Sequence, residues 1–350
     1  MAAIIRRRNR QRNRNIPMRI FRDRLNPLDC YNDTEFQERF RLDRPSFYFL
    51  LNEVEEDLEH ETKRSCAIPS SLQLCIALRF FASGSFFSLT ADIHGVSKAS
   101  VSRIIHKVAN VISRKRSMRI QFPSNVHEQL NVKIKFAQMG FPNTLGIVDG
   151  THVRIATPAG ERERFFVNRK MQHSINCQIV CDAECIIINA VVKWPGSTHD
   201  AFIWDHCSLH DNFLNGTIDN GWIIGDSGYP LQPWLITPLL NPQTRPERRF
   251  NSSLTTVRST VERCIGILKA RFRCLDQTGG KLLFEPERCI PIILACCGLH
   301  NLCRRRNLAF DHPYVENIVY AENNFPNDEI PLGFQSGRVV RNKIIREHFS

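Results

Sequence analysis

Three carboxylates occupy positions at which folding could gather them into one site. Asp149 follows the apolar run of residues 145–148, and Asp226 follows the similar run 222–225, so we expect both at strand ends. An apolar strand that leads into Asp-Gly or Gly-Asp-Ser-Gly directs a carboxylate into the crevice at a sheet edge, where open α/β sheets bind ligands. Glu262 comes one position after Val261 of a predicted helix, at the border of its buried face. We expect all three to point toward one pocket.

Such a pocket has a defined chemistry. Three converging acids repel one another at a cost of several kcal/mol unless divalent cations neutralise them, and Mg²⁺, with Mn²⁺ as the alternative, prefers these oxygen ligands. Two ions about 4 Å apart can activate a water or a 3′-hydroxyl and stabilise the leaving oxygen of a phosphodiester. Taken singly, an Asp after a strand is usually a turn residue and a helical Glu is usually solvated. If folding separates one of the three, or holds it in a permanent arginine bridge, the hypothesis fails.

The elements that must position these acids lie in the second half of the chain. From residue 141 onward, short apolar runs bounded by Gly, Pro and Asn replace a helical pattern. This order predicts an α/β fold with a mixed sheet flanked by helices. Strands are expected at 145–155, 174–181, 185–193, 221–225 and 234–239, and helices at 199–209, 257–272, 291–303 and 338–349.

The first half of the chain has the pattern of helices. Apolar residues recur at helical intervals over 33–58, with one break at Pro45, and again after residues 69–71. A short helix at 88–94, a turn at 95–97 and a longer helix at 98–111 indicate a helix-turn-helix. Helical hairpins with polar outer faces also occur in proteins that never touch DNA. On the outer face of the second helix we assign four residues to DNA binding: Lys98, Ser100, Arg103 and Lys107.

A basic arm precedes these helices. The 350-residue chain carries a formal charge of +12, and nine of its arginines fall within residues 1–24 beside a single acid, Asp23. Such a run repels itself and buries nothing, so residues 1–25 should be disordered until they meet a polyanion, nucleic acid above all. The arm fits DNA binding or nuclear import, and the expected compartment is the nucleus, with the cytoplasm second. The alternative is a solvated tail that aids solubility.

Composition and cysteine usage narrow the class of protein. With 42% hydrophobic and 23% charged residues the chain matches folded soluble proteins, and no apolar run has the length of a membrane span. The 13 cysteines are odd in number and scattered, which fits a reduced intracellular compartment without structural disulfides. Two groups could be considered as metal ligands, but we prefer buried thiols: Cys177, Cys181 and Cys185, and Cys296, Cys297, His300 and Cys303.

Six stretches of sequence together resemble the PIF/Harbinger superfamily of DDE transposases and the harbinger transposase-derived nucleases. The resemblance extends, in family order, from the helix-turn-helix region to the closing helix. Two positions depart from the family pattern: Met171 stands where Gly is expected, and Leu254 stands where His is frequent. The matching segments are 146–152 (GIVDGTH), 167–170 (VNRK), 173–176 (HSIN), 195–200 (PGSTHD), 225–229 (GDSGY), and 261–263 (VER) with 269–273 (KARFR).

The resemblance implies an RNase H-like catalytic core in which Asp149, Asp226 and Glu262 are the catalytic, metal-binding triad. The last two have 35 residues between them, an interval that many such enzymes show. It also implies DNA as substrate, Mg²⁺ or Mn²⁺ as cofactor, and a separate Myb/SANT-like protein partner. We expect no membrane association, and a homo-oligomer stays open. Arg169 and Lys170 are expected to grip the DNA backbone, the alternative being a solvent-facing turn.

Three further residues have two interpretations. His199 and Asp200 open a predicted helix, where they act either in the reaction or as a helix cap. Asp182 is the main rival as second metal ligand, although its Asp-Ala-Glu-Cys context is typical of a hairpin turn.

These features divide the chain and set the hypotheses. We expect a basic disordered arm at 1–25, a helical DNA-binding domain at 26–115, a connector at 116–140, the RNase H-like DDE nuclease domain at 141–310, and a loop with a C-terminal helix at 311–350. The leading hypothesis is a metal-dependent DNA endonuclease or transposase. The alternative is a domesticated, catalytically silent DNA-binding or adaptor protein. A helix-turn-helix regulator with an unrelated ligand domain leaves the three acids unexplained.

Overall fold

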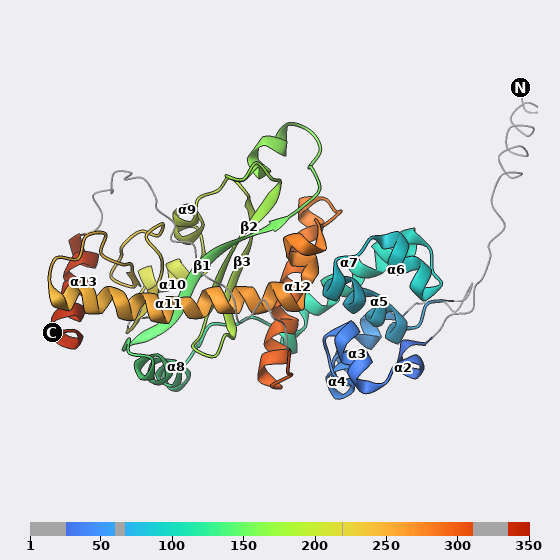
Figure 1. The fold of residues 1–350 in the computed structure, drawn as a ribbon, viewed down its shortest axis with the longest axis horizontal. Coiled ribbons are helices and arrows are strands. Elements are labelled where there is room, and N and C mark those ends of the chain that lie inside the picture. Colours follow the sequence, from blue (N-terminus) through green and yellow to red (C-terminus); the bar gives the residue numbers. More distant parts are fainter. Residues whose placement is uncertain (1–25, 60–66, 219, 311–334) are drawn as a thin grey trace, which may run out of the picture.

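Small helices form the N-terminal part of the chain, and a sheet crossed by long helices forms the rest (Figure 1). The computed structural model describes residues 26–59, 67–218, 220–310 and 335–350. The predicted arm at 1–25 and most of the predicted loop, residues 311–334, lie outside the described residues. The N-terminal helices are α2 (Pro27–Cys30), α3 (Asp33–Phe40), α4 (Arg44–Leu58), α5 (Ser70–Ser83), α6 (Phe87–His94) and α7 (Lys98–Arg114).

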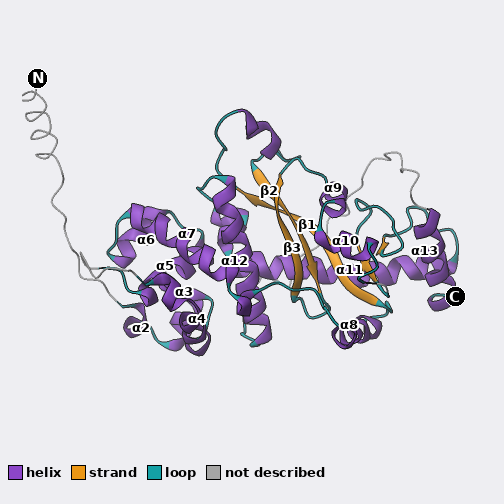
Figure 2. Ribbon diagram, turned by 180° about the vertical axis from the view of Figure 1, so that it is seen from behind, coloured by secondary structure: helices purple, strands orange, loops and turns teal. Residues whose placement is uncertain are grey.

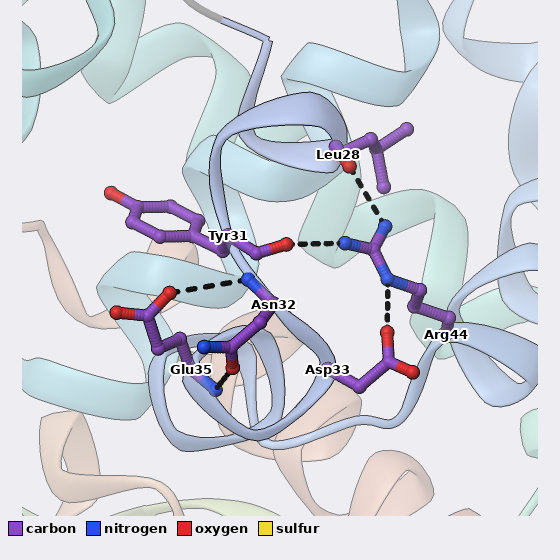
Figure 3. Close-up of polar contacts among 6 residues, drawn as sticks. All are labelled: Leu28, Tyr31, Asn32, Asp33, Glu35 and Arg44. Carbon is purple, nitrogen blue, oxygen red and sulfur yellow. Dashed lines mark hydrogen bonds and ion pairs between the residues drawn. The ribbon is translucent and has the colours of Figure 1, made fainter.

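Arg44 ties the first of these helices together (Figure 3). Its guanidinium donates to the carbonyl oxygens of Leu28 and Tyr31, at 2.9 and 2.6 Å, and pairs with the Asp33 carboxylate at 2.5 Å. Figure 3 also shows the capping box at the start of α3, in which a side chain at each end of the first turn accepts the other residue's backbone N–H. The polar groups of this region therefore have fixed partners.

A tight turn joins α6 to α7, as the sequence predicts. Gly95 ends α6 in the left-handed conformation, at φ 61°, which glycine adopts without strain. Ser97 Oγ accepts the backbone N–H of Ser100 at 3.1 Å and so caps α7. The inward face of α7 is apolar and fully buried at positions such as Val101, Ile105 and Val108.

Five strands form one mixed sheet in the order β3-β2-β1-β4-β5 (Figure 2). β1 pairs antiparallel with β2, and β2 pairs antiparallel with β3, whereas β4 runs parallel to β1 and β5 parallel to β4. The predicted mixed sheet is thus confirmed. Its strands are β1 (Thr144–Arg154), β2 (Ser174–Cys181), β3 (Ile187–Pro195), β4 (Trp222–Ile224) and β5 (Leu235–Ile236).

Helices cover both faces of the sheet. The long helix α11 crosses one face (Figure 1), and α9 and α10 lie on the opposite face, where Trp204 and Phe213 share a buried cluster with Leu145 and Val148 of β1 (Figure 2). The helices of this part are α8 (Val126–Gln138), α9 (Asp200–Asp205), α10 (Ser208–Leu214), α11 (Arg245–Arg271), α12 (Pro286–Arg305) and α13 (Gln335–His348). Among the described helices, none combines the length and apolar character that crossing a bilayer requires.

One hydrophobic cluster joins the N-terminal helices to the α11 face of the sheet. It contains Phe36 of α3, Ile105 of α7, Val261 of α11 and Leu299 of α12, each essentially inaccessible to solvent. α12 packs against both α7 and β3, so it links the two parts directly. The cluster is continuous across residues 116–140, the predicted connector, which contain α8 and a short 3-10 helix.

Four predicted helices have different bounds from those expected. α11 begins 12 residues before the predicted start at 257, since its first half is mostly polar and only a capping box at Thr244 marks its start. The helix expected at 199–209 is two helices, because Cys207 interrupts it and caps α10 through its sulfur. Pro291 lies inside α12 rather than at its start. α13 begins at residue 335, so it takes up the last residues of the predicted loop.

Candidate active site

Asp149 lies inside β1, which corrects the expectation that it ends a strand. The strand continues to Arg154, and its last residues pair with the first residues of β2, including Arg154 with Ser174. The Asp-Gly sequence therefore does not terminate the strand: Asp149 and Gly150 pair with Ile179 and Gln178. Strand alternation places Asp149 on the same face as Ile147 and Val153, which belong to the cluster shared with α11.

Asp226 lies beside Asp149 because the two strands run parallel. Ile147 of β1 is paired with Ile224, the last residue of β4, and each aspartate comes two residues later in the chain. β4 ends at Ile224, so Asp226 is at a strand end, as expected. The backbone N–H of Gly228 donates to Asp226 Oδ1 at 2.9 Å and holds the carboxylate in the loop that follows.

Glu262 comes from the opposite layer, near the middle of α11. The neighbouring Val261 is fully buried, whereas the Glu262 side chain is 14% exposed, so it stands at the border that the helical pattern predicts. One turn earlier on the same helix, Arg258 forms an ion pair with it at 2.5 Å. An arginine pair of this kind argues against cleavage if it is permanent; the Arg258 side chain is 25% exposed.

Burial and mutual repulsion raise the pKa of all three acids. The pKa of Asp149 rises to about 7, because burial disfavours the charged form and because Asp226 and Glu262 add negative charge nearby, against which Arg258 acts. Burial likewise raises the pKa of Asp226 and that of Glu262. The structure therefore brings the three predicted acids, from β1, the end of β4 and α11, into one electrostatic neighbourhood.

The three carboxylates are oxygen donors of the kind that a hard divalent cation prefers, but their side chains would have to move to hold one. Within the described ranges, no three His, Cys, Asp or Glu side chains stand close enough to hold a metal ion together. Carboxylates that raise one another's pKa are nevertheless the oxygen donors that Mg²⁺ and Mn²⁺ prefer. An ion would draw them together and displace Arg258 from Glu262.

Asp200 is a fourth acid at this site, and the sequence left its role open. It is the first residue of α9, and its Oδ1 accepts from Asn176 Nδ2 of β2 at 3.0 Å. A Cβ at Gly150 would come within 2.5 Å of the same Oδ1, so Asp200 packs directly against the residue after Asp149. Its charge also contributes to the raised pKa of Asp226. A glycine at position 150 is the sequence signal for this close approach.

Arg169 and His199 form the edge of the site. The Arg169 guanidinium donates to His199 Nδ1 at 3.2 Å, and its charge acts against the raised pKa of Asp226. His199 stands at the N-cap position of α9, but its side chain makes no capping hydrogen bond. The cap interpretation therefore does not account for this histidine, and Arg169 lies close enough to the acids to influence them.

Lys269, the first residue of the 269–273 segment, is a cation at the site for which the sequence predicts no role. It lies seven residues after Glu262 on α11, and its Nζ donates to the carbonyl oxygen of His152 on β1 at 3.0 Å. Burial lowers the pKa of Lys269, and the Asp149 carboxylate partly offsets that effect. Arg258 and Lys269 flank Glu262 at helical spacings of four and seven, a signal that could have found both.

The loop that carries Lys170 is a tight turn. The side chain of Asn168 is buried, and its Oδ1 accepts the backbone N–H groups of Lys170 and Gln172 at 2.9 and 3.1 Å. Met171, where the family pattern has Gly, adopts φ 56°, in the left-handed region that glycine favours. Leu254, the other departure, is buried in the core at 1% exposure.

The four residues assigned to DNA on α7 differ in their surroundings. Lys98 and Arg103 are exposed, and Ser100 is half-buried beside the cap at Ser97. The Lys107 amino group instead donates to the carbonyl oxygen of Leu58, at 2.8 Å, where α4 ends. A lysine that satisfies a helix C-terminus would have to release it before it could bind a phosphate.

Asp182 and the cysteines have structural surroundings. Asp182 lies in the β2–β3 hairpin turn, and its Oδ1 accepts the backbone N–H groups of Glu184 and Ile186, which confirms the turn interpretation. The cysteines within the described residues are free thiols, and all of these except Cys30 are buried. His300 Nε2 donates to the carbonyl oxygen of Cys185 at 2.8 Å, so this nitrogen is occupied by the backbone.

Comparison with known proteins agrees with this arrangement. The family described as DDE superfamily endonuclease matches residues 148–301, which include all three acids. The chain is 37% identical to the mouse protein named "Putative nuclease HARBI1" over 92% of this chain and 93% of the mouse protein. The human protein of that name is 37% identical over 79% of each chain, and the Arabidopsis thaliana protein named "Protein ALP1-like" is 27% identical over 76% of this chain and 70% of its own. No solved structure gives a significant match. The chain therefore belongs to the DDE superfamily of endonucleases, in the group of the harbinger transposase-derived HARBI1 proteins.

Proposed function

We propose that this chain is a metal-dependent DNA endonuclease of the DDE type, with an RNase H-like core formed by the sheet and α11. The observation that carries the proposal is the convergence of Asp149, Asp226 and Glu262 from three separate elements, with a shared rise in pKa. A structural site satisfies its buried charges, whereas a site that binds cations keeps negative charge in excess. The family membership and the name of the mouse relative support a nuclease.

Each acid has a distinct task in this proposal. Asp149 and Asp226, side by side on parallel strands, would hold divalent ions from the sheet, and Glu262 would hold them from α11 once Arg258 releases it. Bound ions would supply a nucleophilic water or 3′-hydroxyl and a stabilised leaving oxygen. Arg169 and Lys170, at the rim, would bind the DNA backbone and keep the phosphodiester at the acids.

DNA is held, in the same proposal, by the helix pair α6–α7 and by the arginines of residues 1–24. Lys98 and Arg103 of α7 are exposed and near the start of the helix that would enter a groove. Deleting residues 1–24 should weaken binding to a duplex and reduce the slope of log affinity against log salt, because fewer counterions are released. An unchanged slope would assign the arm to solubility alone.

A nicking assay tests the nuclease. The full-length protein, with Mg²⁺ or Mn²⁺, should convert supercoiled plasmid to the open circle, and EDTA should stop it. Asp226→Asn should abolish nicking and leave DNA affinity within about twofold, since a neutral amide of the same shape loses the metal and keeps the fold. Asp205→Asn is the matched control, because Asp205 is an exposed aspartate on α9. Equal rates for Asp226→Asn and wild type would refute the assignment.

A second candidate is the catalytically silent DNA-binding or adaptor protein. The ion pair between Arg258 and Glu262, and the absence of a ready-made ligand group within the described residues, favour it. It predicts DNA binding without metal-dependent nicking, and no thermal stabilisation by Mg²⁺. The same assay with Arg258→Ala decides between the two: nicking that appears or increases supports the nuclease, and none in either form supports the adaptor.

We extend the proposal to a nuclear protein that works with a separate Myb/SANT-like partner. The partner comes from the family resemblance, and the compartment from the arginines of residues 1–24. Fusing residues 1–24 to a reporter and following its position in cells tests the compartment. Co-purification of the full-length chain with a Myb/SANT-like protein from the same source tests the partner.

A further inference from the structure

An aromatic hollow opens at His199, next to Asp200 at the start of α9. It measures about 350 Å³ and is formed where η2 (Glu161–Phe166), the end of β3 and the start of α9 meet. Two of its rings are unusually exposed for aromatic side chains, Phe165 at 48% and Phe202 at 44%. The residues that line the hollow include Phe165, Trp194, Pro195, Thr198, His199 and Phe202.

The rings of this hollow are already ordered for stacking. Trp194 meets Phe202 edge to face with centroids 5.0 Å apart, and Phe202 lies parallel to His206 at 4.0 Å. These contacts fix the Phe202 ring and leave part of its surface uncovered. A flat aromatic ligand could extend the stack at little conformational cost.

The wall of the hollow is rigid. The Ser197 N–H donates to the Phe165 carbonyl at 3.0 Å, and the Asn176 side chain donates to the Thr198 carbonyl at 2.9 Å. Gly196 lies so close to β2 that a Cβ there would come within 2.4 Å of Ser174 Oγ. The loop therefore holds one shape, which is what a preformed binding site requires.

Positive charge surrounds the hollow. Lys193 lies over the Trp194 ring at 5.1 Å, and Arg164 lies over the Phe165 ring at 4.9 Å. Arg169 contacts His199 in the wall. Aromatic faces with cations at the edge match the two parts of a nucleotide, a flat base and an anionic phosphate.

The hollow adjoins Asp200, the fourth acid of the site. His199 lines it, and the next residue, Asp200, packs against Gly150 beside Asp149. We propose that this hollow accepts one unpaired nucleobase of the DNA, next to the bond that is cut. The proposal rests on the nuclease function proposed above and adds to it a substrate feature: the DNA is opened or single-stranded beside the scissile phosphate.

Binding in EDTA tests the hollow without cleavage. Fluorescence anisotropy compares a short blunt duplex with the same duplex carrying a single-stranded end. Wild type should prefer the second, and Phe202→Ala should reduce that preference by about tenfold, in the range of one lost base stack. Phe202→Tyr should keep it. Tyr48→Ala is the matched control, because Tyr48 is a ring of equal exposure (46%) on α4.

Two results overturn the proposal. One is a wild-type protein that binds both DNAs equally, and the other is a Phe202→Ala variant that keeps the full preference at unchanged melting temperature. Loss of a protein–protein contact in Phe202→Ala, with the DNA preference intact, would assign the hollow to a peptide instead. Nicking by wild type with no preference for single-stranded ends would reject the hollow and leave the nuclease standing, whereas no nicking at all rejects the nuclease itself.

Discussion

The first helices and the acid site treat their charges in opposite ways. Arg44, at the start of α4, has three oxygen partners and lies 5.0 Å from the Phe36 ring. Arg258, at the acid site, has one ion pair with Glu262 while two further acids lie close by. The polar groups around Arg44 have partners, and the acid site keeps an excess of negative charge.

This difference distinguishes polar groups that stabilise the fold from charged groups that do not. Fixed, complete hydrogen bonding stabilises a fold, and uncompensated charge in a partly buried site destabilises it. In the proposed function, a chain that retains such a site gains the capacity to bind cations rather than stability.

The largest expected effect is on cleavage. Asp149→Asn should slow metal-dependent nicking by about a thousandfold, because it removes a ligand of the transition-state ions. Asp182→Asn should leave the rate unchanged, since an asparagine Oδ1 can accept the same two backbone N–H groups in the hairpin turn. Nicking rates of the two purified variants make the comparison. A loss of nicking in Asp182→Asn, or no loss of nicking in Asp149→Asn, would contradict the assignment of Asp149 to the reaction.

The second effect is on the free energy of unfolding. The substitution Asp149→Asn, which should slow nicking, should stabilise the fold. The pKa of Asp149 is about 7 when folded, above its ordinary value of 3.8, so the folded protein holds a proton that the unfolded chain has lost. That contribution is complete below pH 4 and is lost as the pH rises through 7. In EDTA at pH 8, Asp149→Asn should therefore be more stable than wild type by up to about 4 kcal/mol.

Urea denaturation at pH 4 and pH 8 measures this effect. The gain from Asp149→Asn should vanish at the lower pH, and Mg²⁺ at pH 8 should stabilise wild type but not the variant. The proton and the ion compete for the same carboxylate, so Mg²⁺ should bind more weakly below pH 7. A variant that is less stable than wild type at pH 8 would contradict the raised pKa.

The two arginines should differ in their effect on folding. Arg44→Ala should cost about 2 kcal/mol, since it leaves two backbone carbonyls and a carboxylate without their donor. Arg258→Ala should cost less than about 1 kcal/mol in EDTA, and Mg²⁺ should remove that cost because the ion takes over its role. Chemical denaturation with and without Mg²⁺ gives both values. An equal cost at both positions, unaffected by Mg²⁺, would make Arg258 a structural residue.

The smallest effect concerns the backbone. Met171→Gly should stabilise the protein by about 1 kcal/mol, because Met171 adopts φ 56° with its side chain 82% exposed. Arg41 at the end of α3 has a similar φ of 64°, but its guanidinium lies 5.1 Å from the Phe310 ring. Arg41→Gly should therefore destabilise. Melting temperatures of the two variants measure both effects. Stabilisation by both substitutions would show that backbone strain alone determines the change in stability.

Much of the fold follows from hydrophobic periodicity. β2 has the predicted bounds, and α7 and α13 are close to them, because their apolar residues repeat over several turns or pleats. The strand expected at 145–155 is close to β1, and only the expectation that Asp149 ends it was wrong: the apolar run ends at Val148, but β1 continues through Thr151 and His152 by pairing with β2.

The site was predictable in its acids and less so in its surroundings. Asp149, Asp226 and Glu262 are adjacent to apolar runs that reveal them, but the role of Asp200 depends on Gly150 coming close to α9. Lys107 lies on the outer face of α7, as the helical pattern indicates, and its amino group still finds the end of α4. The helical pattern predicts the direction of a side chain, but it does not predict which residue that side chain contacts.

The position of α12 has a consequence for where DNA would be cut. α12 packs on α7 and on β3 within one continuous hydrophobic cluster, so the helix pair α6–α7 and the sheet are held as a single rigid piece. In the proposed nuclease, the protein's own dimensions would therefore set the interval along the double helix between the segment that α6–α7 binds and the bond that is cut. Sites of cleavage mapped over many sequences would then fall at one constant offset from the recognised segment.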